Sequence, residues 1–281
     1  MRDEQPMSPT AILEPAQEDQ LWQVEQRLVR DHDELPPELV RHEVARARAL
    51  FTSARITTFV PILVERTARR RLSDSSIGSD SPLTQAMDQS GDYARSMSLR
   101  TWGWYTAKQL LADELPRRWA HTRGVAHRAA EVARSLPAED RQILIAAAWL
   151  HDIGYAEELI DTGFHQLDGA RYLAARGVPR RVCALVAHHA GAAAVAAVRG
   201  LSAELAEFDD EQGPVRDALW YCDMTTAPDG TPVSFAERMR ELRARRSPDD
   251  PVIQALAGNE SERAAAVSRT EELLHSTATL V

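Results

Sequence analysis

The sequence predicts an all-α protein. Apolar residues recur every three or four positions from Glu18 onward, which is the period of one helix face, and no segment shows the alternation of a strand. Prolines and glycines separate these periodic segments, as they do where helices start and stop. Apolar residues make up 44% of the 281 residues, which is enough to form a sizeable core.

The sequence of the N-terminal quarter predicts a disordered tail followed by a small helical bundle. Residues 1–16 are polar, contain several prolines and have no helical period, so we expect a disordered tail. Three short amphipathic helices are expected over residues 17–72, with a break at Pro36 and Pro37. The third helix, with Phe59 and Leu63 on its apolar face, should begin just before Pro61. A proline in the first turn removes an N–H that would have had no helical partner.

A linker and a larger domain follow. Residues 73–98 are rich in Ser, Asp and Gly, which predicts a flexible linker. Core-forming residues return at Trp102 and Trp104, so we expect a larger helical domain over residues 99–246. Residues 247–281 predict a C-terminal extension of one or two surface helices.

Charge and composition limit the partners and the compartment. The formal net charge of −9 disfavours general binding to nucleic acid or to anionic membranes. No secretory signal is recognisable, and no run reaches the roughly 18 apolar residues that cross a bilayer. With only two cysteines, we predict a cytoplasmic protein. The 33 basic residues are arginines except for Lys108, which indicates a GC-rich bacterial genome.

Histidines and aspartates mark the ends of the predicted helices in the larger domain. The adjacent pair His151 and Asp152 follows an apolar run and precedes Gly154, which should end that helix. Five further residues share this kind of placement: His121, His165, His188, His189 and Asp223. Residues far apart in sequence can meet inside a helical bundle and bind a metal ion. Imidazole and carboxylate ligands suit manganese, iron, cobalt or zinc better than calcium.

Four of these residues resemble, in order and spacing, the motif of the HD superfamily of metal-dependent phosphohydrolases: His121, His151, Asp152 and Asp223. The flanking segments 118–125, 148–154 and 220–226 match as well, and the resemblance covers about residues 105–245. It implies an HD-type helical bundle with a divalent ion held between helices. It also implies hydrolysis of a phosphomonoester or phosphodiester, in a small molecule or nucleotide, by metal-activated water.

The remaining histidines are similar to those of binuclear members, which include the HD-GYP cyclic-dinucleotide phosphodiesterases. By that resemblance Asp152 bridges two ions, and His121, His151 and Asp223 complete the first site. The second ion would be held by three further histidines: His165, His188 and His189. One or two ions per chain are therefore expected. Asp152 is the expected catalytic centre, and two ions would clamp a phosphate and activate a shared water.

Arg118 is the best candidate for a phosphate-binding arginine, because a guanidinium fork matches phosphate oxygens. A solvent-facing position is the alternative. Other neighbours are given structural roles: His127 should face away from His121, Asp168 should lie on a solvated helix face, and Trp220 should belong to the core.

The known substrates of the superfamily do not carry over. Tyr155 stands where the cyclic-dinucleotide enzymes have lysine, and no Gly-Tyr-Pro signature follows His189. The Glu-Asp pair of the alarmone hydrolases is missing, as is the His/Pro/Phe-rich segment of the dNTP triphosphohydrolases. The substrate therefore stays open. A non-catalytic sensor that binds a metal ion or nucleotide remains the alternative to an enzyme.

Residues 17–72, through the segment 51–66 in particular, resemble an actinobacterial three-helix-bundle dimerisation domain, which implies a homodimer. The competing interpretation is a helix-turn-helix DNA-binding domain that uses the arginines of residues 66–71. Acidic and basic residues nearly balance over residues 1–72, which argues against it. A sensor would signal through this dimer.

Overall fold

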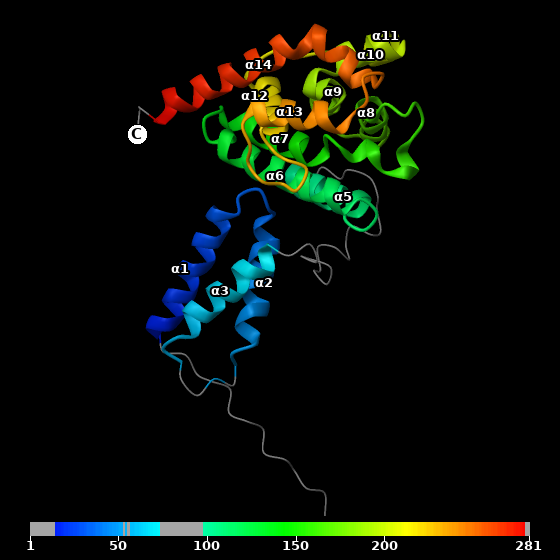
Figure 1. The fold of residues 1–281 in the computed structure, drawn as a ribbon. Helices are drawn as coiled ribbons and strands as arrows, with labels where there is room; N and C mark the ends of the chain where they lie inside the picture. The colour runs from blue at the N-terminus through cyan, green and yellow to red at the C-terminus, as the bar shows by residue number, and fades with distance from the viewer. Residues whose placement is uncertain (1–14, 53, 55–56, 74–97, 279–281) are drawn as a thin grey trace, which may run out of the picture. The chain divides into compact units, whose positions relative to one another are not determined.

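The structure, a computed structural model, describes residues 15–52, 54, 57–73 and 98–278 (Figure 1). The chain divides into two compact units, residues 1–90 and 91–281. The described residues form helices and no strand, with a single isolated bridge between Thr226 and Pro232, so the all-α prediction is confirmed. Most of the predicted tail and linker lies outside the described residues.

The first unit is a bundle of α1 (Pro15–Asp31), α2 (Pro37–Ala49) and α3 (Val60–Leu72), each in contact with the other two. Pro37 and Pro61 lie in the first turns of α2 and α3, as expected. The buried face of α3 differs from the predicted one. Val60, Val64, Ala68 and Leu72 are buried, whereas Phe59 and Leu63 are exposed.

Two of the four arginines that a DNA-binding domain would use are paired within the bundle, whereas Arg66 and Arg70 are exposed. Arg69 bonds to Asp31 at 2.6 Å and to Glu65 at 3.0 Å. The Nε atom of Arg71 donates to the buried carboxylate of Glu43 at 2.7 Å. These side chains hold the three helices together, which leaves less positive charge for a phosphate backbone.

The second unit holds the remaining elements. In chain order they are α5 (Leu99–Leu111), α6 (Pro116–Ala133), α7 (Ala138–Leu150), η1 (Ile153–Tyr155), η2 (Glu157–Leu159), α8 (His165–Ala175), α9 (Arg180–His188), η3 (His189–Gly191), α10 (Ala192–Arg199), α11 (Ser202–Leu205), α12 (Pro214–Met224), α13 (Phe235–Arg245) and α14 (Pro251–Ala278). Helix α7 is central. It packs against α5, α6, α9 and α12, and every residue from Leu144 to Leu150 is buried. A helix that is apolar on all sides belongs in the core.

The C-terminal extension is a single helix, within the predicted one or two. Helix α14 packs against α10, α12 and α13, as Figure 1 shows at the red end of the chain. Its buried face includes Leu256, Val267, Asn259 and Arg263, and most of its other residues are exposed or half-buried. The extension therefore lies on the surface of the second unit and belongs to it.

One segment, Arg180–Arg199, is long and apolar enough to cross a membrane. It spans α9, η3 and α10, and 67% of its apolar window is buried inside the unit. The segment also kinks at Ala190, where φ is 49°. These properties are those of core helices in a soluble protein. Both cysteines, Cys183 and Cys222, are buried and unbridged.

Candidate metal centre

The structure brings six of the seven predicted ligands together at the ends of helices. They form two groups, His121 with His151 and Asp223, and Asp152 with His165 and His189. Within each group the ligand atoms lie within 4.8 Å of one another. The second turn of α6, the end of α7, the start of α8, the η3 turn and the last turn of α12 supply them. Five are buried, and the His165 side chain is 17% exposed.

Backbone carbonyls fix the orientation of three imidazoles. The Nδ1 atom of His121 lies 3.1 Å from the carbonyl of Ala227. In His151 the corresponding distance to the Ala148 carbonyl is 2.8 Å, and in His189 the Val186 carbonyl lies 2.7 Å away. A carbonyl only accepts, so Nδ1 donates and Nε2 keeps its lone pair. All three lone pairs thus belong to the ring nitrogen that a metal ion would use.

Asp152 presents one oxygen to each group. Its Oδ2 atom lies 3.2 Å from His151 Nε2, and its Oδ1 atom lies 3.4 Å from His165 Nε2 and 3.7 Å from His189 Nε2. Asp223 Oδ1 lies 3.0 Å from His121 Nε2. A carboxylate placed between two ligand groups in this way is suited to bridge two cations.

The donor set fits divalent metal ions. His121 turns Nε2 toward a carboxylate oxygen, and the Nε2 atoms of His165 and His189 are 3.3 Å apart. The Nε2 atom of His151 is buried without a hydrogen bond, although Asp152 lies near it. Lone pairs that face one another in a buried site repel unless a cation lies between them. Imidazole and carboxylate ligands match manganese, iron, cobalt or zinc.

The pKa shifts of these groups are those of a site that attracts cations. Burial lowers the pKa of His165 to about 4, because imidazolium is poorly solvated there, so the ring is neutral near pH 7. Burial alone would raise the pKa of Asp152, but Arg118 and His151 outweigh burial and hold that pKa well below its usual range. Asp152 in turn raises the pKa of His151 against the effect of its burial. The pKa of Asp223 is likewise lowered, since hydrogen bonding and charge from His121 outweigh its burial, so a proton on these imidazoles takes the place that a metal ion would take.

Arg118 and Tyr155 line the same centre. Arg118 donates from Nη1 to Asp152 Oδ2 at 2.6 Å, and its guanidinium lies 4.0 Å from the centre of the Tyr155 ring. The other face of Tyr155 stacks on His165, with 3.9 Å between ring centroids. Tyr155 therefore positions both a ligand and the predicted phosphate-binding residue. From the sequence it was considered only as a departure from a known motif.

His188 joins neither group, so its predicted role as a ligand is not supported by the geometry. Its Nε2 atom donates to the Phe208 carbonyl at 2.7 Å. His188 ends α9 and His189 begins η3, and the chain kinks next at Ala190, which has φ of 49°. The two side chains leave the chain at adjacent positions, about 100° apart around the helix, so their rings diverge.

Three other predictions concerned structural roles. Asp168 was expected on a solvated face, but it is buried and its Oδ1 accepts from Thr162 N at 3.0 Å and Oγ1 at 2.7 Å. It therefore fixes the loop before α8. Trp220 is in the core as predicted, and donates to the His188 carbonyl at 2.9 Å. His127 is exposed on α6, as predicted.

Gly154 allows α8 to approach Asp152. A Cβ atom at this position would lie 2.0 Å from the carbonyl oxygen of His165 and 2.7 Å from the amide of Gly169. No side chain fits there without moving the start of α8. The glycine predicted to end α7 thus also brings His165 to the centre.

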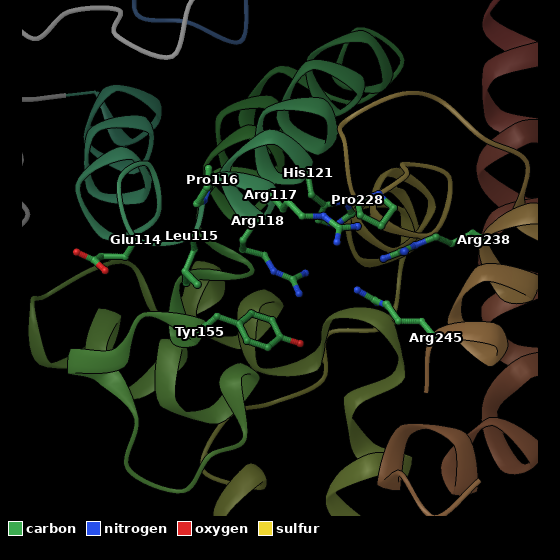
Figure 2. A pocket seen from close by; sticks show the side chains of 10 residues that line it. All are labelled: Glu114, Leu115, Pro116, Arg117, Arg118, His121, Tyr155, Pro228, Arg238 and Arg245. Atoms are coloured by element: carbon green, nitrogen blue, oxygen red, sulfur yellow. The ribbon is translucent and has the colours of Figure 1, made fainter. Parts of the chain in front are cut away.

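Two hollows adjoin the ligand groups. The larger, about 410 Å³, is lined by His121, Tyr155 and four arginines (Figure 2). The smaller, about 60 Å³, is lined by Asp152, Asp223 and five arginines. Those that sequence reasoning missed are Arg238, Arg245, Arg246 and Arg263. The abundance of arginine hid them, and only their concentration on α13 and α14 could have drawn attention.

Comparison with known families supports this centre. Residues 118–222 match the family model described as HD domain, which supports membership of the HD superfamily. The matched region contains every residue of the two groups except Asp223, which follows it directly. No curated protein and no solved structure matches the chain significantly.

Proposed function

We propose that this chain, with its HD domain at residues 118–222, is a metal-dependent phosphohydrolase acting on a phosphate ester of a small molecule or nucleotide. One observation carries the proposal. Two buried groups of imidazole and carboxylate side chains meet at Asp152, with imidazole protons turned outward to backbone carbonyls. Such an arrangement is costly to bury unless it binds cations.

The residues of this chain divide the work of hydrolysis. A bound divalent ion would supply a water of lowered pKa and neutralise charge on the phosphate. Asp152 can serve both groups at once, one oxygen for each. Arg118 turns its guanidinium into the larger hollow, where it can donate to a phosphate oxygen while it stays bonded to Asp152 (Figure 2). Tyr155 keeps Arg118 in place by stacking beneath it.

The test uses the full chain loaded with manganese or iron. We expect hydrolysis of p-nitrophenyl phosphate, its bis ester or a member of a nucleotide panel, and we expect Asp152→Asn to abolish it. Asp168→Asn is the matched control, because this buried carboxylate lies outside both groups and the amide oxygen can still accept from Thr162. Equal turnover by wild type and Asp152→Asn would refute the proposal.

A sensor is the second candidate, and Tyr155 is the observation that favours it, because it replaces the lysine of the related cyclic-dinucleotide enzymes. A sensor would bind metal ions or nucleotides without turnover. Metal analysis that finds the ions bound, together with no hydrolysis across the panel, would support this candidate over the enzyme.

We also propose that the first unit forms a homodimer in the cytoplasm. Among the described residues, seven large hydrophobic side chains are exposed, and five of them lie in this unit: Trp22, Leu50, Phe59, Ile62 and Leu63. Apolar side chains at this density on a small unit favour burial against a second copy. Sedimentation equilibrium should give a dimer that Ile62→Glu dissociates. A wild-type monomer at micromolar concentration would contradict the proposal.

A further inference from the structure

We propose that α13 and α14 form a binding site for linked phosphates, so that the substrate of the phosphohydrolase proposed above carries a pyrophosphate or longer oligophosphate group. The inference rests on that function and adds the substrate class. It is carried by six arginines around the two hollows beside the ligand groups: Arg117, Arg118, Arg238, Arg245, Arg246 and Arg263.

The arginines converge from separate helices. Figure 2 shows the guanidinium groups of Arg117 and Arg118, from α6, turned toward those of Arg238 and Arg245, from α13, across the larger hollow. Arg118, Arg238 and Arg245 also line the smaller hollow, where Asp152 lies. The two hollows therefore share a wall of three arginines, and each has a residue of the ligand groups in its lining.

Carboxylates are fewer than arginines in the lining of the two hollows, although Glu241 and Asp250, outside the lining, pair with three of the arginines. Three acidic residues line the hollows, Glu114, Asp152 and Asp223, and two of them belong to the ligand groups. Glu114 points away from the hollow (Figure 2). A ligand that enters this space therefore meets an excess of guanidinium groups.

The pairings of the α13 arginines leave donors over. Arg238 and Arg245 share one carboxylate, that of Glu241, at 2.5 Å and 3.0 Å. Arg246 pairs with Asp250 at 2.8 Å. Each guanidinium has five N–H donors, so a single carboxylate satisfies a minority of them. The remaining donors are available to anionic oxygens.

Arg263 is the least compensated member. It lies on α14 with 2% of its surface exposed, and its Nε atom is buried without a hydrogen-bond partner. Burial lowers the pKa of Arg263 to about 10 although the charges of Asp223 and Glu260 oppose the lowering, so the side chain is still charged near pH 7. A buried N–H donor without an acceptor is costly, and an anion that accepts from it would remove that cost.

The arginines that line the two hollows favour a ligand with several linked phosphates. Guanidinium groups bind phosphate oxygens in pairs, and a single phosphate has too few oxygens to pair with all six arginines that line the hollows. A chain of linked phosphates places several charges along the same line. It can extend from the larger hollow to Asp152 while successive phosphates meet successive arginines.

Four of the six arginines lie outside the region that matches the family. The match ends at residue 222, whereas Arg238, Arg245, Arg246 and Arg263 all follow it. Most of the proposed phosphate-chain site therefore comes from a different part of the sequence than the ligand groups. Substrate choice can change in α13 and α14 without loss of the ligand groups.

Calorimetry on metal-free full-length protein tests the proposal, because oligophosphates would chelate bound metal ions. We expect inorganic tripolyphosphate to bind about tenfold more tightly than orthophosphate, with pyrophosphate between them. Arg263→Gln and Arg246→Gln should each weaken tripolyphosphate binding by about tenfold. Arg180→Gln is the control. It makes the same charge change at a side chain that is 73% exposed and lines neither hollow.

Equal affinity for the three anions, or equal weakening by the control, would overturn the proposal. If circular dichroism shows that Arg263→Gln does not fold, Arg245→Gln makes the same test at a side chain that is 37% exposed. A nucleoside triphosphate that binds as tightly as tripolyphosphate, or more tightly, supports a nucleotide as the source of the chain. Binding of tripolyphosphate alone supports an inorganic one.

The calorimetric result is independent of turnover. Selective oligophosphate binding without hydrolysis of any substrate would refute the proposed enzyme and leave the binding site standing. Hydrolysis of p-nitrophenyl phosphate without selectivity among the three anions would refute the binding site alone.

Discussion

At the scale of single residues, the protons on the histidines organise the metal centre. His121, His151 and His189 each direct Nδ1 to a backbone carbonyl, so the Nε2 lone pairs are set by the backbone. The sequence identified the candidate histidines but could not separate His188 from His189. Adjacent helical residues point about 100° apart, and helical periodicity alone does not show which of the two faces the ligand groups.

The neighbouring histidines provide a matched pair of variants. We expect His189→Gln to weaken metal binding by more than the roughly 10–100-fold that loss of an outer hydrogen bond costs, because it removes a nitrogen of the second group. His188→Gln should leave metal content unchanged, since the glutamine amide can still donate to Phe208. Inductively coupled plasma mass spectrometry measures both. Equal metal content in the two variants would show that the assignment is wrong.

Tyr155 contributes its ring rather than its hydroxyl. Its two faces contact Arg118 and His165. We expect Tyr155→Phe to keep kcat/KM near the wild-type value, whereas Tyr155→Ala should lower it by about tenfold through loss of the cation–π and stacking contacts. Steady-state kinetics on the best substrate decides this. A large loss in Tyr155→Phe would instead assign the role to the hydroxyl.

At the scale of elements, prolines and glycines made the helix boundaries predictable. Pro116 and Pro214 lie in the first turns of α6 and α12. Gly154, after the His-Asp pair, lets α8 pack closely against η1. The faces of helices were harder to predict. Phe59 and Leu63 were assigned to a buried face of α3 but are exposed, because apolar spacing alone does not show which side of a helix meets its neighbours.

Gly154 tests how closely η1 and α8 must pack. We expect Gly154→Ala to destabilise the second unit by about 1–3 kcal/mol, because its Cβ would lie 2.0 Å from the His165 carbonyl. Bound metal should fall as His165 moves. Gly258→Ala in α14 is the control, since nothing lies within 4 Å of its Cβ and alanine favours a helix by about 1 kcal/mol. Thermal melting and metal analysis would contradict the argument if both variants behaved alike.

At the scale of the whole molecule, the two units differ in what should stabilise them. The ligand groups join α6, α7, α8, η3 and α12, all within the second unit. The first unit contains none of these residues. The all-α class could be predicted from periodicity, and most of the ligands from their spacing. The arginines of α13 and α14 could not be predicted as a group, because their convergence depends on how α14 returns to η3.

Metal removal should therefore affect one unit only. At free metal about 100-fold above Kd, binding stabilises the folded state by about 2.7 kcal/mol. For a unit of this size, each kcal/mol shifts Tm by roughly 2–4 °C. Calorimetric scans with and without chelator should move the transition of the second unit and leave that of the first in place. A shift of both transitions by the same amount would contradict the separation.

Helix α14 touches both ends of this chemistry. Asn259 donates to the Gly191 carbonyl at 2.9 Å, beside the turn that carries His189, and Arg263 follows one helical turn later. An anion that moves Arg263 would therefore also move η3, the turn that carries the proposed metal ligand His189. By thermodynamic reciprocity, if a bound oligophosphate changes the affinity for the metal ion by some factor, the bound metal ion changes the affinity for the oligophosphate by the same factor. Through helix α14, the binding of the proposed oligophosphate and the binding of the metal ion would thus influence each other.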